Sequence, residues 1–312
     1  MHDRLIGVDV GGTKVSVATL IDGRLSEPLL RPTDTSSTDA LIDQLVGAIR
    51  EAAGDEGAAA VGLGVPSVVD WATGTIRSSV NIPLADVPLR EVLRERLDGM
   101  PVYVDNDATV AALAEAHADD GTPDVSSLVM FTCGTGVGGG IVIDGRVFHG
   151  ATGAAAELGH MIIGAEVRDG RPAHRERFPQ PGSLEALAAG RALDVIAQDA
   201  GYDDGIHAVD AAHQGEQAAI DAIALIGHRL GLGIANMINA LDPEVVAIGG
   251  GVSAAGELLL DPAKETAALF VVPGVGTSTE IRIARSGPRA GVRGAALLAG
   301  QELTREQEVA HR

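Results

Sequence analysis

Apolar and polar residues follow the same order in two stretches of the chain, at residues 5–24 and 128–146. Each stretch consists of an apolar run, a Gly/Thr turn, a second apolar run and an Asp-Gly turn. Short apolar runs separated by glycine turns predict strands that are joined as a meander. The repetition therefore predicts two half-folds of one design.

Helical periodicity follows each meander. Leu41, Leu45 and Ile49 recur at helical spacing behind Thr38, a residue suited to cap a helix. Strands that alternate with helices indicate an α/β fold. Further helices are predicted over residues 86–97, 108–118, 184–200, 217–241, 257–270 and 291–308, and further strands over 60–65, 102–104, 245–248 and 280–284.

The length predicts two domains. The chain has 312 residues, whereas a single core rarely grows beyond about 250–300 residues. We expect a smaller N-terminal α/β domain over residues 1–118, joined by the C-terminal helix 291–312, and a larger C-terminal α/β domain over residues 119–290. Aromatic residues make up only 2 % of the chain, so aliphatic side chains must fill both cores.

Charge and cysteine content exclude several classes of protein. The formal charge of -20 argues against a nucleic-acid partner, because phosphates are met with Lys and Arg. The single cysteine, Cys133, excludes an intrachain disulfide framework. A strand that begins by Leu5 leaves no room for a signal peptide, and polar residues or glycine interrupt every long apolar stretch. We expect a cytoplasmic protein with no membrane partner.

The two Gly/Thr turns are candidates for phosphate binding, because glycine lets successive backbone amides approach an anion. Either turn alone could be a tight hairpin. The second also matches the dinucleotide fingerprint Gly-x-Gly-x-x-Gly, but a strand follows it where that fingerprint requires a helix. Two such turns in matching contexts favour a nucleotide-driven phosphoryl transferase. Their residues are Gly11, Gly12, Thr13 and Lys14, and Gly134, Thr135 and Gly136.

Four polar or glycine-rich sites are candidates for chemistry, and one of them, at Asp107, lies at the carboxyl end of a predicted strand, where α/β sheets place ligands. Asn106 and Asp107 lie between a predicted strand and a predicted helix. Either residue could cap the helix, or Asp107 could be a general base. Glu157 and His160, three residues apart, are a surface pair or a clamp for vicinal hydroxyls. Glu185 begins a helix, where an acidic residue is favourable in any case. The run Gly249, Gly250, Gly251 is a tight turn or the seat of a base and ribose.

Together these motifs resemble the ROK (repressor, open reading frame, kinase) sugar kinases over nearly the whole chain. The resemblance implies an actin-like ATPase (ribonuclease H-like) fold, an α/β fold with two duplicated domains and an interdomain cleft. The motifs that carry it are Gly7-x-Asp9-x-Gly11-Gly12-Thr13-Lys14, Gly62-x-Gly64-x-Pro66, Val69-Asp70, Asn81-Ile82-Pro83, Asn106-Asp107, Gly134 to Gly140, Gly153, Glu157-x-Gly159-His160-Met161, Leu184-Glu185, Ile248 to Val252 and Gly294-Ala295-Ala296.

The resemblance also implies roles for individual residues. The chain would transfer the γ-phosphate of ATP to the 6-hydroxyl of a hexose, glucose by default, with Asp107 as the base. Asp9 would orient Mg²⁺ through water, and the protein would be a homodimer. The implied sugar ligands are Asn81, Asn106, Glu157, His160 and Glu185; the implied ATP ligands are Asp9, both Gly/Thr turns with Lys14, and Gly249, Gly250 and Gly251.

The chain departs from this family at a structural zinc site. Three cysteines that many members place before the Leu-Glu pair correspond to Glu176, Phe178 and Ser183, so we expect no zinc. His160, which matches the zinc-binding histidine, then needs another partner, and we expect Glu176 or a loop carbonyl. The same loop carries Arg168, Arg171, Arg175 and Arg177, for which a solvated loop is the default interpretation. Ser67, where relatives often have Gly, puts sugar specificity in question.

Other functions remain open beside the glucokinase-like one. An amino or N-acetylamino hexose (kanosamine, N-acetylmannosamine or N-acetylglucosamine) is an alternative acceptor, and polyphosphate is an alternative donor. A non-catalytic sugar sensor is a further alternative, although the chain retains Asp107 and both turns. A repressor of the same family needs a DNA-binding segment before the first turn, and the nine residues up to Asp9 leave no room for one.

Overall fold

The structure is a computed structural model that describes residues 4–79 and 81–311. The chain divides into two compact units. Unit 1 comprises residues 1–126, 140–156 and 286–312, and unit 2 comprises residues 127–139 and 157–285. Segment 140–156, which the sequence analysis assigns to the C-terminal domain, thus belongs to unit 1.

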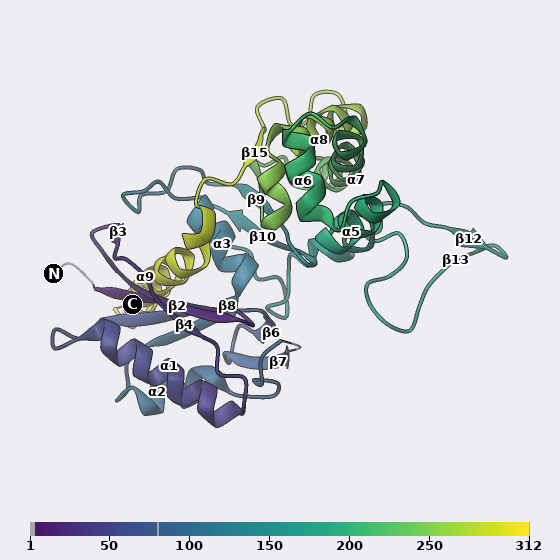
Figure 1. Ribbon diagram of the computed structural model, residues 1–312. Coiled ribbons are helices and arrows are strands. Elements are labelled where there is room, and N and C mark those ends of the chain that lie inside the picture. Colours follow the sequence, from purple (N-terminus) through teal and green to yellow (C-terminus); the bar gives the residue numbers. More distant parts are fainter. Residues whose placement is uncertain (1–3, 80, 312) are drawn as a thin grey trace. The chain divides into compact units, whose positions relative to one another are not determined.

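The sheet of unit 1 has the strand order β3-β2-β1-β5-β8, and β4 also pairs with β2 (Figure 1). Strand β1 runs antiparallel to β2 and parallel to β5, which is parallel to β8. The strands are β1 (Leu5–Val10), β2 (Lys14–Ile21), β3 (Arg24–Leu25), β4 (Leu29–Pro32), β5 (Ala60–Val65) and β8 (Val102–Asn106). A separate hairpin joins β6 (Ser67–Asp70) to β7 (Thr75–Ser79), where the sequence analysis predicts no strands.

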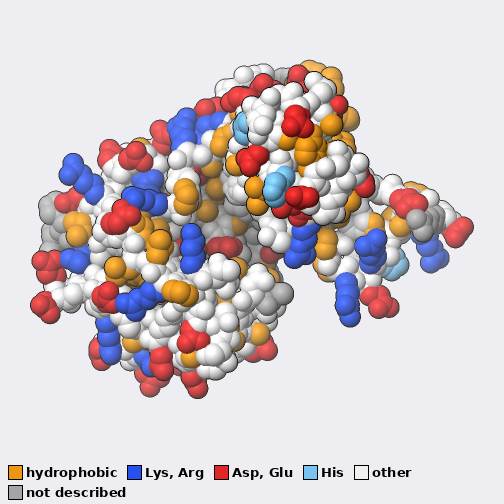
Figure 2. Space-filling model, in the orientation of Figure 1, with side chains coloured by type: hydrophobic (Ala, Val, Ile, Leu, Met, Phe, Trp, Pro, Cys, Tyr) orange, Lys and Arg blue, Asp and Glu red, His pale blue; other side chains and the backbone are white. Residues whose placement is uncertain are grey.

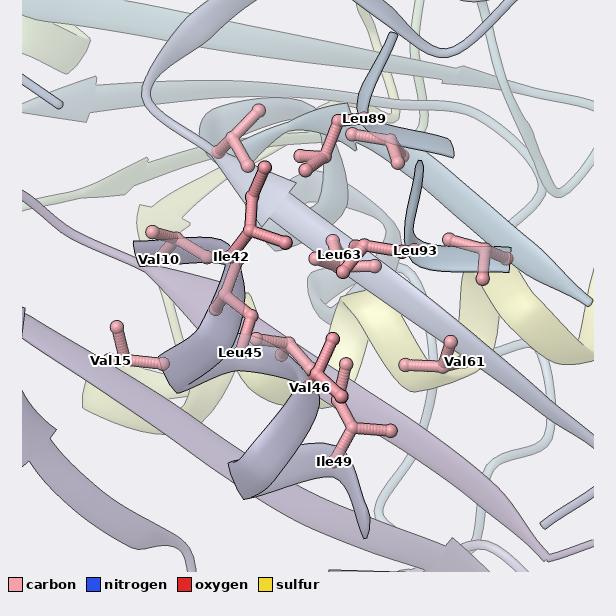
Figure 3. Packing of buried hydrophobic residues seen from close by; sticks show 14 of the residues in the cluster. Val10, Val15, Ile42, Leu45, Val46, Ile49, Val61, Leu63, Leu89 and Leu93 are labelled. Atoms are coloured by element: carbon pink, nitrogen blue, oxygen red, sulfur yellow. The ribbon is translucent and has the colours of Figure 1, made fainter. Parts of the chain in front are cut away.

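Helices cover both faces of this sheet. On one face, α1 (Thr38–Ala53) and α2 (Leu89–Arg96) build an aliphatic core with the strands (Figure 3). Ile42, Leu45 and Ile49 of α1 meet Val61 and Leu63 of β5 there. This core is aliphatic, as the low aromatic content predicts. The other face carries α3 (Asp107–Glu115) and α9 (Ala290–Ala310).

Three glycines let α9 lie directly on its neighbours. A Cβ atom at Gly7 of β1 would collide with the carbonyl of Val292, and one at Gly62 of β5 would collide with that of Ala295. On α9 itself, a Cβ at Gly294 would collide with a carbonyl of α3. The glycines are therefore required by close backbone approach, and they hold the C-terminal helix against β1, β5 and α3.

The second sheet has the strand order β11-β10-β9-β14-β15. Its strands are β9 (Leu128–Cys133), β10 (Val137–Ile143), β11 (Arg146–Val147), β14 (Val245–Gly249) and β15 (Glu280–Ile283). Strand β14 is parallel to both β9 and β15, and β11 is antiparallel to β10. This is the order of the first sheet, with a hairpin at one edge and parallel strands at the other. The predicted α/β fold with two half-folds of one design is confirmed.

Unit 2 carries its helices around α7 (Gln217–Leu241), which packs against α8 (Glu257–Phe270). Helix α7 is long and apolar enough to span a membrane by composition, but Gly227 and Gly231 place it in close contact with α8. Most of its apolar residues are buried inside unit 2, so it is a core helix. The remaining elements are η1 (Leu158–His160), β12 (Val167–Arg168), β13 (Arg171–Pro172), α4 (Leu184–Ala188), α5 (Gly190–Asp199), α6 (Gly205–His213) and η2 (Gly251–Ala255).

Three local predictions were wrong. Ser37, not Thr38, caps α1, because its Oγ accepts from the amide of Ala40, while Thr38 Oγ1 donates to the Pro83 carbonyl. The single helix predicted over 184–200 is broken at Ala189, whose backbone is extended. Helix α6 was not predicted, although Asp204 caps it with a side-chain hydrogen bond.

Candidate functional site

In unit 1, polar side chains gather where β1 and β8 end. Asn106 caps α3: its Oδ1 accepts from the amides of Ala108 and Thr109 at 2.9 and 3.2 Å. The capping role weighed for Asn106 from the sequence is thus present. Asp107 begins the helix and lies near Asp9 of β1, close enough for the two carboxylates to influence each other.

Burial makes both carboxylates weaker acids than usual. It raises the pKa of Asp9 to about 6, the negative charge of Asp107 adds to the rise, and Lys14 opposes it. Burial also raises the pKa of Asp107. The amide of Ala108, which donates to the Asp107 carboxylate at 2.8 Å, acts in the opposite direction and lowers this pKa by less. Gly291 of α9 leaves room for Asp9, since a Cβ there would lie 2.6 Å from the Asp9 carboxyl carbon.

The first Gly/Thr turn is closed at its base and open at its tip. The Gly11 amide donates to the Lys14 carbonyl at 2.8 Å, and the hydroxyl of Thr33 donates to the Gly11 carbonyl at 2.6 Å. The amides of Gly12 and Thr13 make no hydrogen bond to any residue that the structure describes. They are therefore available to an anion. Asn81 lies beside this turn, because a Cβ at Gly12 would come within 3.3 Å of its Cβ.

The second turn, in unit 2, has the same form. The Gly134 amide donates to the Gly136 carbonyl at 2.9 Å, and within the described residues the amides of Thr135 and Gly136 have no partner. The Gly134 carbonyl accepts from the amide of Gly190 at 2.7 Å, which places the start of α5 against the turn. This contact explains the helix break at Ala189.

Val137, the residue after this turn, holds two candidate sugar-binding elements in place. Its amide donates to Glu185 Oε2 at 2.9 Å, and its carbonyl lies so close to Gly159 that no Cβ would fit there. The amide of Leu184 also donates to the Met161 carbonyl at 2.8 Å. Glu185 is therefore brought close to the distant segment that carries Glu157 and His160, within unit 2.

His160 lies near Glu157 but makes no hydrogen bond with it. The closest approach of their side chains is 3.9 Å, between Nε2 and Oε2. The expectation that Glu176 or a loop carbonyl binds the His160 ring was wrong, since this ring makes no hydrogen bond to any residue that the structure describes. The Phe178 ring packs against it in a T-shaped arrangement, with centroids 5.1 Å apart. Ser183, another position matched to a zinc cysteine, caps α4 instead. No group of three metal-binding side chains occurs within the described ranges.

The glycine run after β14 lies against the second turn. Gly250 has φ +85°, and a Cβ there would collide with the backbone of Cys133, so only glycine fits. Burial raises the pKa of the Cys133 thiol to about 12, so this cysteine is inert. Gly251, Gly134 and Thr135 border one cavity of about 500 Å³, while Gly136, Gly249 and Gly250 are not in its lining.

Residues to which the sequence analysis assigned no role complete this cavity. Helices α5 and α6 contribute both apolar and charged side chains, and Ile206 is 73 % exposed at its edge. A largely apolar cavity with a few polar groups is typical of a small-molecule site. The added lining residues are Gly190, Arg191, Leu193, Asp194, Gly205, Ile206, Val209, Asp210, Val252 and Ala254.

Comparison with known proteins identifies the family. A model of the ROK family matches residues 5–302. The chain is 36 % identical to a glucokinase of Halalkalibacterium halodurans over 97 % of each sequence. This chain belongs to the ROK family. The resemblance inferred from the motifs is confirmed.

Solved ROK structures share the fold along the whole chain. A ROK hexokinase from Thermus thermophilus matches with a TM-score of 0.80 and 34 % identity, over 97 % of this chain and 99 % of that one. A ROK family glucokinase from Streptomyces griseus, in complex with glucose and AMPPNP, matches with a TM-score of 0.76 and 30 % identity, over 96 % of this chain and 99 % of that one.

Proposed function

We propose that this ROK protein is an ATP-dependent hexose kinase that phosphorylates the 6-hydroxyl of glucose. The chain matches a glucokinase over almost its full length, and a related glucokinase was solved with glucose and an ATP analogue. The observation that carries the proposal is the position of Asp107, a carboxylate at the start of α3 with a raised pKa and an Asp9 neighbour. We also propose that the enzyme acts in the cytoplasm.

Asp107 is the proposed general base. As the sugar O6 attacks the γ-phosphorus, the 6-hydroxyl proton passes to Asp107, the O6–P bond forms, and the bond from phosphorus to the ADP oxygen breaks. A carboxylate whose pKa lies nearer to neutrality is a better proton acceptor than an ordinary aspartate. Asn81, Asn106, Glu157, His160 and Glu185 are the proposed sugar ligands, and they orient the 6-hydroxyl toward this base.

The two glycine turns are the proposed phosphate ligands. Each offers two neighbouring amides that have no partner among the described residues, Gly12 and Thr13 in one turn and Thr135 and Gly136 in the other. Positioned amides stabilise charge on a transferring phosphoryl group without reorganisation. We place the adenosine in the cavity bordered by Gly251 and Ile206, beside Gly249 and Gly250.

The residues of unit 1 fit a hydrated Mg²⁺. Carboxylate oxygens are preferred Mg²⁺ ligands, and Asp9 is a carboxylate whose burial is unfavourable without a cation. Asp9 would hold the ion through water, with Lys14 nearby. When bound, the ion neutralises phosphate charge. No zinc role is proposed, since the chain has one cysteine and Ser183 caps a helix.

A coupled ADP-release assay tests the activity. The acceptors are glucose, mannose, fructose, glucosamine, kanosamine and the N-acetylated hexosamines, each with ATP and Mg²⁺. Polyphosphate is tested as a second donor by measuring the sugar phosphate formed, because that reaction releases no ADP. We expect glucose to give the highest kcat/KM and Asp107→Asn to lower kcat by about 10²–10⁴-fold. A higher kcat/KM with an amino sugar than with glucose would identify the amino sugar as the acceptor. Sugar binding without turnover would indicate a sensor.

We also propose that the protein is a homodimer. The end of α8 exposes apolar side chains that a second copy can cover: Leu269 is 80 % exposed and Phe270 58 %. Size-exclusion chromatography coupled to light scattering, which gives the mass of the protein in solution, tests this proposal. We expect a dimeric mass for the natural chain and a smaller mass for Phe270→Glu. A monomeric mass for the natural chain at micromolar concentration would contradict it.

A further inference from the structure

A second cavity of unit 2, of about 890 Å³, is lined by four arginines. It lies between α4, α5 and residues 175–182 of the loop that follows β13. Arg175 and Arg177 come from this loop, Arg191 from the first turn of α5, and Arg229 from α7. Figure 2 shows basic side chains gathered at the base of the β12–β13 hairpin, beside hydrophobic ones. In a chain with a formal charge of -20, this concentration of arginine is unusual.

These four arginines lack acidic partners. Within the part of the chain that the structure describes, none of them forms an ion pair. Nine arginines elsewhere form ion pairs with neighbouring carboxylates. The paired arginines are Arg4, Arg31, Arg50, Arg77, Arg96, Arg282, Arg285, Arg289 and Arg305. The cavity therefore collects positive charge that the protein itself does not neutralise.

Hydrogen bonds hold the side chain of one of these arginines and the backbone of another. The guanidinium of Arg229 is half-buried and donates to the Leu187 carbonyl at 2.8 Å. The backbone amide and carbonyl of Arg175 are both hydrogen-bonded to the side chain of Gln180 at 2.7 Å. The contact of Arg229 limits the side-chain entropy that it loses when it binds a ligand, and the contacts of Arg175 fix the loop that carries its side chain.

The rest of the lining is mainly apolar, with two carboxylates. Phe178, Val195 and Ile196 supply apolar surface. The two carboxylates are Glu185 and Asp199, and Glu185 accepts a hydrogen bond from the Val137 amide. The charge balance is thus four cations against two anions. Guanidinium forks in this number match the paired oxygens of phosphate groups.

We propose that this cavity binds a second anion rich in phosphate groups, in addition to the nucleotide. Thr135 and Arg191 line both this cavity and the one proposed for adenosine, so the two cavities adjoin. Two kinds of molecule share the required chemistry: a phosphorylated sugar, whose ring packs on the apolar surface, and a chain of condensed phosphates, which extends along the arginines. The cavity shares Thr135 and Glu185 with the proposed substrate site. A second anion goes beyond the ATP-dependent phosphorylation of glucose, because that reaction needs one nucleotide and one neutral sugar.

Calorimetric titration of the full chain tests the proposal. The protein is first saturated with glucose and with AMPPNP and an equimolar amount of Mg²⁺, so that the substrate site is filled. Inorganic tripolyphosphate and glucose 6-phosphate are then titrated separately at low salt. The same titrations are made with the double variant Arg175→Gln, Arg177→Gln. Arg171→Gln is the matched control, since Arg171 lies in β13 outside the cavity lining.

We expect one further equivalent of at least one probe to bind the saturated natural chain. The double variant should bind it at least tenfold more weakly, and the control within twofold of the natural chain. Binding of glucose 6-phosphate identifies the phosphorylated sugar as the ligand class, and binding of tripolyphosphate alone identifies condensed phosphate. Equal affinity in the double variant, or no binding of either probe, would overturn the proposal. AMPPNP and glucose affinities, measured in the same samples, show separately whether the substrate site is intact.

Discussion

The Nε2 atom of His149 lies 2.7 Å from Oδ2 of Asp105, whose side chain is 1 % exposed. The other carboxylate oxygen of Asp105 accepts from the amide of Asn106 at 2.7 Å. The His149 ring stacks on Trp71 with centroids 3.8 Å apart. One buried carboxylate therefore links the stacked ring to the end of β8, immediately before the proposed base Asp107.

Two substitutions at His149 separate its hydrogen bond from its stacking. His149→Phe keeps an aromatic ring on Trp71 but leaves the buried Oδ2 of Asp105 without its hydrogen-bond partner, which costs about 1–3 kcal/mol of stability. We expect it to lower kcat about tenfold, with a smaller change in KM, because the Asn106–Asp107 backbone is less well fixed. His149→Gln, which can still donate to Asp105, should recover most of kcat. Equal kcat in all three proteins would contradict a positioning role.

The raised pKa of Asp9 predicts an acid limb in the activity profile. A carboxylate with a pKa of about 6 is mostly ionised at pH 7.5 and mostly protonated at pH 5. Activity that needs the ionised form must therefore fall as the pH is lowered through about 6. We expect kcat/KM, which reports the free enzyme, to be about tenfold lower at pH 5 than at pH 7.5.

Two controls accompany this profile. Circular dichroism at pH 5 should show folded protein, and activity should return at pH 7.5. The proposed Mg²⁺ would compete with the proton for Asp9, so a higher Mg²⁺ concentration should move the midpoint to lower pH. A profile that stays flat down to pH 5 would exclude a buried carboxylate from the rate-determining chemistry.

Ala156 has an unfavourable backbone conformation just before Glu157. Its φ is +69°, in the left-handed region, which costs an L-residue roughly 1–2 kcal/mol. Ala156→Gly relieves this strain but makes the unfolded chain more flexible, which offsets part of the gain. We expect its free energy of unfolding to rise by up to about 1 kcal/mol. Ala155→Gly is the control: Ala155 has no positive φ, and the same denaturation experiment should show a loss.

Gly190 is required where α5 meets the second Gly/Thr turn. A Cβ at this position would lie 2.8 Å from the Gly134 carbonyl, whereas one at Gly47 of α1 would meet nothing within 4 Å. Gly190→Ala should displace the turn and raise KM for ATP about tenfold, with little effect on sugar affinity. Gly47→Ala should leave both constants unchanged and stabilise the protein by roughly 0.5–1 kcal/mol. An unchanged KM for ATP in Gly190→Ala would separate this turn from nucleotide binding.

The sequence predicts most elements, because each carries its own local signal. Strand β5 and helices α7 and α8 have the predicted bounds, since apolar periodicity and flanking polar or glycine residues define both ends. The break at Ala189 could not be predicted, because alanine favours helix and the cause is a hydrogen bond to the distant Gly134. The packing of Phe178 on His160 is likewise a contact between segments, for which neither residue carries a local signal.

Helix α9 has a consequence for synthesis of the protein. The face of the first sheet that carries Gly7 and Gly62 is covered by residues 290–310, which are translated after all the other elements of both sheets. Until then β1 and β5 lack the helix that covers that face, although they were made first. Domains generally fold as units during translation, but unit 1 can be completed only after residues 290–310 have been translated. A nascent chain stalled before residue 290 should therefore remain sensitive to protease in its N-terminal part, even though unit 2 is already fully translated.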